Sequence, residues 1–151
     1  MSDVEDWNAK TIGEFRANEG RVGGVFEGAP LVLLHHRGRT SGRAYVTPVM
    51  YLPHDTEQDI IYVFATKGGA PTNPDWYDNL TAAGDGRIER GPETYNVTVH
   101  ELIGTERDRA YAEQGRRYPG FADYARKTAG VRTIPVLELT RRVARVPKTE
   151  R

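Results

Sequence analysis

Three arginines stand close together in the stretch Arg37-Gly38-Arg39-Thr40-Ser41-Gly42-Arg43, which lies between two apolar runs. A guanidinium group is a planar fork of donors that suits phosphate or carboxylate oxygens. The two glycines allow positive φ angles and a close approach of the backbone to a ligand. The stretch therefore predicts an anion site, and a solvated basic hairpin turn is the alternative that these residues leave open.

A second segment with related chemistry is Ala65-Thr66-Lys67-Gly68-Gly69, where an apolar run ends in a hydroxyl, a lysine and two glycines. Main-chain N–H groups exposed in such a loop, together with the Lys67 ammonium, can hold a phosphate or the polar edge of a ring. An ordinary turn after a strand would use the same residues.

A helix start with flat side chains follows at Asn73-Pro74-Asp75. Asn73 is a preferred N-cap, Pro74 suits the first helical position, and Asp75 complements the positive end of the helix dipole. Helix N-termini attract anions, and Trp76 and Tyr77 add aromatic surfaces. In the alternative interpretation, Trp76 only anchors the helix in the core.

Aromatic residues surround a helix break at Tyr118-Pro119-Gly120, which Phe121 and Tyr124 follow. Rings at this spacing can wall a flat pocket, and the phenol of Tyr118 or Tyr124 can act as a proton donor. Packing of the same rings into the core is the competing interpretation.

Composition excludes several functions. The chain has 151 residues, which suits a single domain, and it has 21 basic and 21 acidic residues, so no overall charge attracts nucleic acid or an anionic membrane. There is no cysteine, which excludes disulfides and thiolate chemistry. An acidic N-terminus without a long apolar run predicts a cytoplasmic protein with no stable membrane anchor.

The four histidines do not predict a metal site. His35 and His36 are neighbours on an expected strand and point to opposite faces, while His54 and His100 have no partner at ligand spacing. The sequence also lacks a phosphate-binding P-loop, a dinucleotide fingerprint and a Ser-His-Asp pattern. Hydrolysis and nicotinamide chemistry are therefore not indicated, and no metal is expected.

Short apolar and β-branched runs predict six strands, and helical patterns fall between them. The strands are expected at 31–36, 45–52, 59–66, around Ile88, at 94–103 and at 134–139. Helices are expected at 11–18, from Asn73 to a stop at Gly84, at 105–117 with Thr105 and Asp108 as a capping box, and at 121–128. Pro48 predicts an edge, a bulge or a ligand-facing position in its strand.

The order of these elements favours an α+β, mainly β fold, because strands and helices do not alternate regularly. We expect a mostly antiparallel sheet closed into a small barrel with helices packed outside. Residues 1–22 form a polar N-terminal segment, 23–140 the barrel domain, and 141–151 a basic tail predicted to be disordered.

Taken in order, four motifs resemble the deazaflavin (coenzyme F420)-dependent nitroreductase and quinone reductase family of actinobacteria. The motifs are 38–42, 66–69, 73–80 and 132–136, and the likeness runs from about Gly23 to Leu139. The resemblance implies a split β-barrel like that of flavin reductases and pyridoxamine-phosphate oxidases. It also implies an oxidoreductase that passes a hydride from reduced coenzyme F420, a deazaflavin with a phosphate and a poly-glutamate tail, to a quinone, nitro compound or other electrophilic acceptor.

The resemblance also assigns site residues by position. It places the phosphate at Arg39, Thr40 and Ser41, with Lys67 nearby. We expect the anionic tail to be anchored by Arg37, Arg39, Arg43 and Lys67. It places the ring along Tyr45, Val46, Thr47, Pro48, Val49 and Met50, bordered by Phe64, Ala65 and Thr66. The groove is closed by Asp75, Trp76, Tyr77, Asp78 and Asn79.

Two departures from the family pattern concern the acceptor side. Phe121 stands where quinone and nitro reductases of this family tend to carry tyrosine, so it can stack on the acceptor or on the cofactor ring but leaves Tyr118, Tyr124 or water as proton donor. The N-terminal segment is short and acidic, which favours a soluble acceptor over a membrane quinone.

Three alternatives remain: an FMN-binding split barrel, a non-catalytic deazaflavin carrier, and, against the charge balance, a nucleic-acid-binding barrel. A homodimer is also compatible with the fold.

Overall fold

The computed structural model describes residues 3–23 and 28–142, with side chains from Trp7 onward. The strands are β1 (Leu31–Arg37), β2 (Ala44–Pro53), β3 (Ile60–Phe64), β4 (Asp85–Arg90), β5 (Glu93–Leu102) and β6 (Val136–Arg141). The helices are α1 (Asp3–Ala17), α2 (Asp75–Ala83), α3 (Gly104–Arg117) and α4 (Pro119–Thr128), and η2 (Lys67–Gly69) is a 3-10 turn. The last nine residues of the predicted tail, 143–151, lie outside the described residues.

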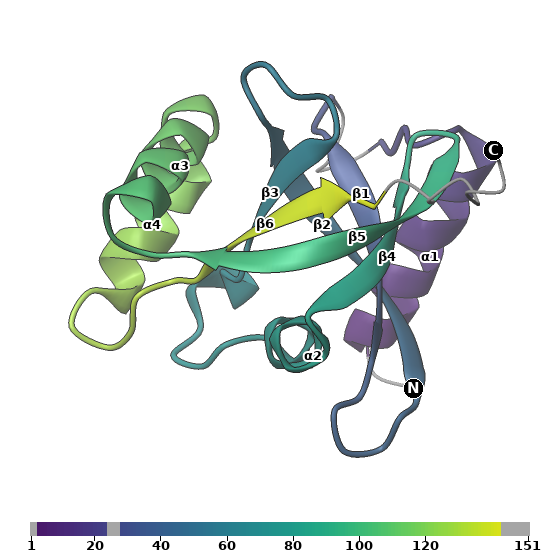
Figure 1. Ribbon diagram of the computed structural model, residues 1–151, viewed down its shortest axis with the longest axis horizontal. Helices are drawn as coiled ribbons and strands as arrows, with labels where there is room; N and C mark the ends of the chain where they lie inside the picture. The colour runs from purple at the N-terminus through teal and green to yellow at the C-terminus, as the bar shows by residue number, and fades with distance from the viewer. Residues whose placement is uncertain (1–2, 24–27, 143–151) are drawn as a thin grey trace, which may run out of the picture.

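The strands close into one antiparallel barrel in the order β1-β2-β3-β6-β5-β4 (Figure 1). This confirms the closed antiparallel sheet expected from the sequence. Within the barrel, β2 pairs with two different strands along its length. Its residues 44–50 pair with β1, and its residues 51–53 pair with β3. The sheet therefore divides between β2 and β3, as in a split barrel.

Pro48 lies in the divided part of the sheet. It is buried and stands opposite Leu33 of β1, and β3 begins to pair with β2 only at Tyr51. Proline cannot donate a ladder hydrogen bond and is tolerated at sheet edges. Of the three positions predicted for Pro48 (an edge, a bulge or a ligand-facing position), the strand pairing shows the edge.

The apolar run of β1 is continuous because both of its faces are covered. Val32 and Leu34 pack in the main core cluster with residues of the other strands, whereas Leu31 and Leu33 pack with Phe15 of α1. All four residues of this run are at most 3% exposed. The run from Leu31 to Leu34 does not alternate, because both faces of β1 are covered along these residues.

Helix α1 extends well beyond the predicted 11–18, since it begins at Asp3. It is anchored on β4 by Arg16, whose Nε and Nη2 donate to the two carboxylate oxygens of Glu89 at 3.0 and 2.7 Å. Glu89 Oε2 also lies 2.6 Å from His35 Nε2. The hydrogen bond from Arg16 is the largest cause of the lowered pKa of Glu89.

Helices α3 and α4 pack together on the side of the barrel opposite α1 (Figure 1). Phe64 at the end of β3 meets the rings of Tyr111 and Phe121, each at a centroid distance of 5.8 Å. The Tyr111 hydroxyl donates to the Phe121 carbonyl at 2.6 Å, which ties the two helices together. The predicted break at Tyr118 is confirmed, because α3 ends at Arg117 and α4 begins at Pro119.

The predicted capping box at Thr105 and Asp108 is wrong. Helix α3 begins one residue earlier, with Ile103 in the N-cap position, and within residues 28–142 no side chain caps this end. Asp108 instead accepts from Arg107 Nη1 at 3.0 Å. The neighbouring arginine is a stronger donor for a carboxylate than a main-chain amide.

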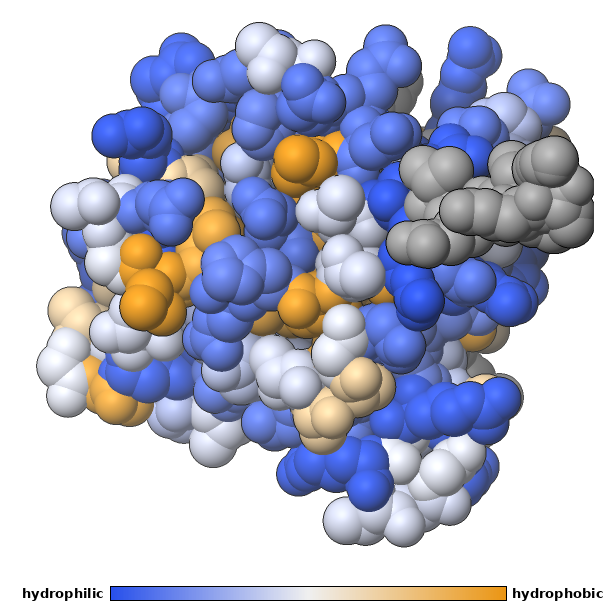
Figure 2. Space-filling view, in the orientation of Figure 1, coloured by the Kyte–Doolittle hydropathy of each residue, from blue (hydrophilic) through white to orange (hydrophobic). Residues whose placement is uncertain are grey.

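The face shown in Figure 2 is mainly hydrophilic, with hydrophobic residues in small separate patches. Among the described residues, the exposed large apolar or aromatic side chains are Trp7, Tyr45, Ile103 and Val131. None of the helices formed by residues 3–17 and 75–128 is long and apolar enough to cross a bilayer.

Gln114 of α3 provides a stability prediction. Its side chain is fully buried, and within the described part of the chain neither amide atom has a hydrogen-bond partner. Because a buried unpartnered polar group costs about 1–3 kcal/mol, we expect Gln114→Leu to raise the free energy of unfolding by about 1–2 kcal/mol. Urea unfolding followed by circular dichroism measures the change. A midpoint that does not rise would show that the amide has a partner, such as an internal water.

Candidate functional site

A groove of about 780 Å³ opens where the β1–β2 hairpin, α1 and the start of α2 meet. Figure 1 shows the hairpin projecting beyond the barrel next to these helices. Ten residues predicted to bind a cofactor line the groove: Arg39, Thr40, Ser41, Tyr45, Val46, Thr47, Lys67, Asp75, Trp76 and Asn79. The remaining lining comes from Asn8, Ala9, Ile12, His36, Gly38 and Pro74.

The hairpin loop is shaped by its own hydrogen bonds. The Gly38 N–H donates to the Arg43 carbonyl at 2.9 Å, and the Gly42 N–H donates to the Gly38 carbonyl at 2.8 Å. The Ser41 hydroxyl accepts from the Arg43 N–H at 3.2 Å. A Cβ atom at position 38 would collide with the Ser41 hydroxyl, and Gly42 has a φ of +72°. Both glycines are therefore required by the geometry of the loop.

Helix α2 starts beside this loop, although not with the predicted cap. The helix begins at Asp75 with Pro74 in the N-cap position, and within the described residues no side chain caps it. Asn73 Oδ1 instead accepts from Arg132 Nη1 at 2.7 Å. The predicted stop at Gly84 is confirmed, since this residue ends the helix in the left-handed conformation with a φ of 77°.

A chain of buried polar groups joins α2 to both strands of the hairpin. Asn79 Oδ1 accepts from the Arg39 main-chain N–H at 3.0 Å, and Asn79 Nδ2 lies 3.0 Å from His36 Nδ1. His36 Nε2 lies 3.0 Å from Thr47 Oγ1, and its ring stacks on Tyr45 at 5.5 Å. Burial is the main cause of a lowered pKa of His36, which favours the neutral ring.

The Lys67 loop faces the same groove in an unusual backbone conformation. Thr66 is in the right-handed helical region, while Lys67 (φ 48°) and Gly68 (φ 63°) are in the left-handed region. Such an alternation can turn successive N–H groups toward one side as an anion-binding concavity. Here the Thr66 N–H already donates to the Phe64 carbonyl at 2.9 Å, and Lys67 is the residue of this loop that lines the groove. A non-glycine residue at positive φ is uncommon and is kept where surrounding contacts enforce it.

Arg132 provides the enforcing contacts for the Lys67 loop. Its guanidinium donates to the carbonyl oxygens of Ala65 (3.1 Å), Thr66 (2.8 Å) and Ala70 (3.0 Å), as well as to Asn73 Oδ1. Burial lowers the pKa of Arg132, yet all of its partners are neutral. The loop between β3 and α2 is thus held from inside by a single side chain.

The cations around the groove are available to an external anion. Within the described residues, no carboxylate lies within 4.0 Å of Arg37, Arg43 or Lys67. Arg39 Nη1 has a long contact of 3.9 Å to Asp78, where both side chains are well exposed, and it donates to the neutral Asn79 Oδ1 at 3.4 Å. Lys67 Nζ donates to the neutral Thr72 hydroxyl at 3.0 Å. Positive charge is therefore concentrated here, and among the described residues the two nearby carboxylates, Asp75 in the lining and Asp78, form no close ion pair with it.

The aromatic residues predicted for the acceptor side lie outside this groove but next to one of its walls. Phe121 packs on Phe64, and Tyr118 and Tyr124 flank Phe121 at centroid distances of 6.5 and 5.6 Å. A Cβ atom at Gly69 would lie 3.4 Å from Tyr124. Helix α4 therefore packs against η2, whose first residue, Lys67, lines the groove.

The other residues predicted to bind the cofactor do not line this groove. Arg37 and Arg43 flank the loop of the β1–β2 hairpin. Phe64 and Ala65 lie in the core, and the Thr66 carbonyl accepts a hydrogen bond from Arg132. Val49 packs against the main core and Met50 against the cluster beneath α1. Tyr77 points toward β5, because its hydroxyl donates to Glu101 at 2.8 Å.

Two residues that matter for this site were not predicted for it. His36 was considered only as a metal ligand and set aside, although it directly precedes the arginine loop in the chain. Arg132 was noted only within a motif. Arg132 is a single arginine after a helix, and nothing in the sequence indicates that it bonds to carbonyl groups more than 60 positions away.

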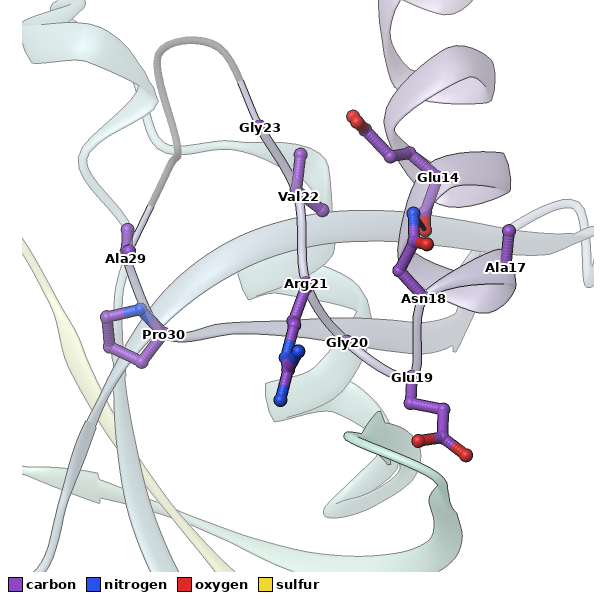
Figure 3. A pocket seen from close by; sticks show the side chains of 11 residues that line it. Glu14, Ala17, Asn18, Glu19, Gly20, Arg21, Val22, Gly23, Ala29 and Pro30 are labelled. Atoms are coloured by element: carbon purple, nitrogen blue, oxygen red, sulfur yellow. Dashed lines mark hydrogen bonds between the residues drawn. The ribbon is translucent and has the colours of Figure 1, made fainter.

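A larger hollow of about 890 Å³ lies between the end of α1 and the start of β1. In Figure 3, Ala29 and Pro30 stand on one side of it, with Glu14, Ala17 and Asn18 on the other. The Asn18 amide donates to the Glu14 carbonyl at 3.0 Å, as a contact at the helix end. Because cations do not converge on this hollow, we place the candidate site in the smaller groove.

The barrel and the groove together define the class of this protein. It is a split β-barrel in which a basic hairpin, a glycine-rich turn and a helix start converge on a groove suited to a flat, anionic cofactor. Clusters of His, Cys, Asp and Glu able to hold a metal ion do not occur among the described residues.

Comparison with known proteins gives the family. Residues 7–141 match the family described as F420H(2)-dependent quinone reductase, so this chain belongs to that family and is an oxidoreductase that depends on coenzyme F420. The chain is 31% identical over 153 residues to the F420H(2)-dependent quinone reductase Rv1261c of Mycobacterium tuberculosis. The alignment covers 93% of this chain and 99% of that relative.

Solved structures agree with this assignment. The F420-H2 dependent reductase FDR-A is 32% identical with a TM-score of 0.63, over 73% of this chain and 93% of that one. A structure described as a domain-swapped dimer is 29% identical with a TM-score of 0.65, over 90% of this chain and 96% of that one. The resemblance inferred from the four motifs, the split barrel and the deazaflavin cofactor are thereby confirmed.

Proposed function

We propose that this protein transfers a hydride from reduced coenzyme F420 to a quinone, with nitro compounds and other electrophiles as further acceptors. The observation that carries the proposal is the groove beside α2, where Arg39 and Lys67 converge without a close carboxylate partner among the described residues. A phosphate with a poly-glutamate tail is an anion of the size and charge that such a groove accommodates.

The anionic part of the coenzyme is held by the basic hairpin. Arg39, Thr40 and Ser41 supply a guanidinium and two hydroxyls at the groove, and Lys67 faces them from η2. Arg37 and Arg43 add charge at the hairpin ends. Binding energy from this remote tail serves to fix the position of the ring.

The flat part of the coenzyme lies along β2 next to Trp76. Tyr45, Val46 and Thr47 line this side of the groove, and Trp76 is nearly buried at the start of α2. When bound, the deazaflavin supplies the hydride chemistry. The chain orients the ring and excludes water from one of its faces.

The proton that follows the hydride has two phenols as candidate sources on α4 and at its start. Tyr77 and Tyr111 are unsuited, because burial raises the pKa of each to about 12 and their hydroxyls donate to Glu101 and to a carbonyl. Tyr118 and Tyr124 are partly exposed, and Tyr124 adjoins η2. We therefore assign Tyr124 as the first candidate donor, with Tyr118 as the second.

We expect Tyr124→Phe to lower kcat by about 100-fold while changing the coenzyme affinity less than about two-fold, as for the loss of a general acid. Stopped-flow oxidation of the reduced coenzyme measures the first quantity, and fluorescence titration measures the second. Tyr62→Phe is the matched control, because Tyr62 is a partly exposed tyrosine of β3 next to Glu138. Loss of affinity with unchanged kcat would instead make Tyr124 a binding residue.

Acceptor class is tested by turnover. Reduced coenzyme F420 is mixed with the protein and either a water-soluble benzoquinone or a nitroaromatic, and recovery of the oxidised deazaflavin is followed by absorbance. Protein-dependent oxidation with the quinone supports the proposal. Tight coenzyme binding without turnover of any acceptor would support the non-catalytic carrier.

A homodimer is proposed as the functional assembly. Support comes from the similar structure described as a domain-swapped dimer, which the chain matches over 90% of its length. Because the candidate groove is formed within one chain, the assignment of its residues does not depend on this assembly.

A further inference from the structure

The buried polar chain between Arg39 and Thr47 determines where its protons lie. The main-chain N–H of Arg39 can only donate, so Asn79 Oδ1, 3.0 Å away, must accept. The amide nitrogen of Asn79 then donates to His36 Nδ1 at 3.0 Å. An imidazole that accepts at Nδ1 carries its proton on Nε2, and this N–H donates to Thr47 Oγ1 at 3.0 Å.

This order of donors leaves the hydroxyl proton of Thr47 free to point into the groove. Thr47 Oγ1 accepts from His36, so its own hydroxyl proton points to another acceptor. Among the described residues the Thr47 hydroxyl makes no other hydrogen bond, and Thr47 lines the groove. A ligand in the groove that carries a carbonyl oxygen or an unprotonated ring nitrogen would complete the chain.

We propose that His36 is a positioning residue of the coenzyme site, which turns the Thr47 hydroxyl into a donor to a polar atom at the edge of the bound deazaflavin ring. This inference rests on the proposed function. It joins the two parts of the site, because the same Asn79 that orients His36 also receives the main-chain N–H of Arg39 in the anion-binding loop. Tail binding and ring orientation thus share one hydrogen-bonded chain.

The surroundings of His36 keep its ring neutral near pH 7. Burial lowers its pKa below the ordinary value of 6.5, His35 of β1 lowers it further, and Asp75 of α2 opposes the shift. Arg39 of the loop bonds to the same Asn79, and Tyr45 of β2 stacks on the ring. Protonation of His36 at Nδ1 would place that N–H opposite the Asn79 amide N–H, so the hydrogen bond between them would be lost. The hydrogen-bonded chain is therefore intact above the ordinary pKa of histidine and is lost as pH falls through the lowered pKa of His36.

The first test needs no coenzyme. Nitrogen-15 NMR of histidine-labelled ligand-free protein at pH 7.5 reports the tautomer of each ring, with His36→Phe identifying the signal. We expect His36 to be protonated at Nε2 and unprotonated at Nδ1. The opposite tautomer, or a charged ring, would overturn the proposal.

The second test is a double-mutant cycle on the affinity for oxidised coenzyme F420. Thr47→Val keeps the β-branched shape and loses the hydroxyl, so we expect about 5- to 10-fold weaker binding, and Thr47→Ser should restore it. His36→Phe should weaken binding at least as much. Because Thr47 acts through the orientation that His36 sets, the double variant should bind within about two-fold of His36→Phe alone. Effects that multiply would show independent roles and refute the relay.

The third readout is a pH profile of coenzyme affinity. The ratio of the wild-type affinity to that of His36→Phe cancels the titration of the coenzyme itself. We expect this ratio to stay level above 6.5, the ordinary value for histidine, and to fall as pH decreases through the lowered pKa of His36. A ratio that rises as pH decreases, or one that already falls above pH 6.5, would contradict the relay. A wild type that does not bind the coenzyme would instead overturn the proposed function, while the NMR result decides the His36 tautomer by itself.

Discussion

Arg39→Ala should weaken binding of oxidised coenzyme F420 by about 1.5–3 kcal/mol, which corresponds to about 10- to 150-fold in Kd. Arg39 lines the groove, and on binding an anion its guanidinium releases a 3.9 Å contact with Asp78 and a 3.4 Å hydrogen bond to Asn79. Its main-chain N–H to Asn79 is retained in the variant, so the loop should keep its shape. Fluorescence titration at low and moderate salt measures the change.

Arg109→Ala is the matched control for this experiment. Arg109 is an exposed arginine of α3 and lines a separate hollow beside Tyr62 and Glu113. Its removal changes the net charge equally but should alter the coenzyme affinity by less than about two-fold, because exposed charges at a distance are screened. Equal losses in both variants would mean that general charge, rather than this groove, attracts the coenzyme.

Arg132→Met should lower the free energy of unfolding by about 3 kcal/mol, since it leaves several carbonyl groups of the β3–α2 connection without their donor. The lost hydrogen bonds are those to Ala65, Thr66 and Ala70 and to the Asn73 side chain. Urea unfolding measures the loss as a lower midpoint at an unchanged slope. Coenzyme affinity should fall as well, because the Lys67 loop loses its support.

Two further variants separate this effect from a simple loss of charge. Arg132→Lys keeps the charge but lacks the planar fork, so it should recover only part of the stability. Arg117→Ala removes a surface ion pair with Glu113 at 2.7 Å and should cost less than about 1 kcal/mol. If Arg132→Met were no worse than Arg117→Ala, the guanidinium would not be what holds the loop.

Much of the fold could be predicted because its signals are local. The runs around Leu31 and Val49 are too apolar and β-branched for loops, and Gly84 marks the end of a helix by its need for positive φ. Pro48 correctly indicated a strand edge. The start of α1 was missed, because most residues before Thr11 are polar and the contact of Arg16 with Glu89 spans 73 positions.

The site residues likewise fall into those with local sequence signals and those that depend on distant contacts. The arginine loop and the start of α2 carry their chemistry in adjacent residues, and the structure brings Arg39 and Trp76 to one groove. The sequence could not show that Asn73 bonds to Arg132 instead of capping α2. The preference for a cap is local, whereas Arg132 comes from a loop far along the chain. The role of His36 could not be predicted either, because it depends on hydrogen bonds to Asn79 of α2 and Thr47 of β2.

The most direct test of the central claim is a fluorescence titration of the purified wild-type protein with oxidised coenzyme F420 and, in parallel, with flavin mononucleotide. The account predicts saturable binding of the deazaflavin that is at least ten-fold tighter than binding of the flavin, and that weakens in Arg39→Ala. Preference for flavin mononucleotide, or deazaflavin binding unaffected by Arg39→Ala, would contradict the placement of coenzyme F420 in this groove.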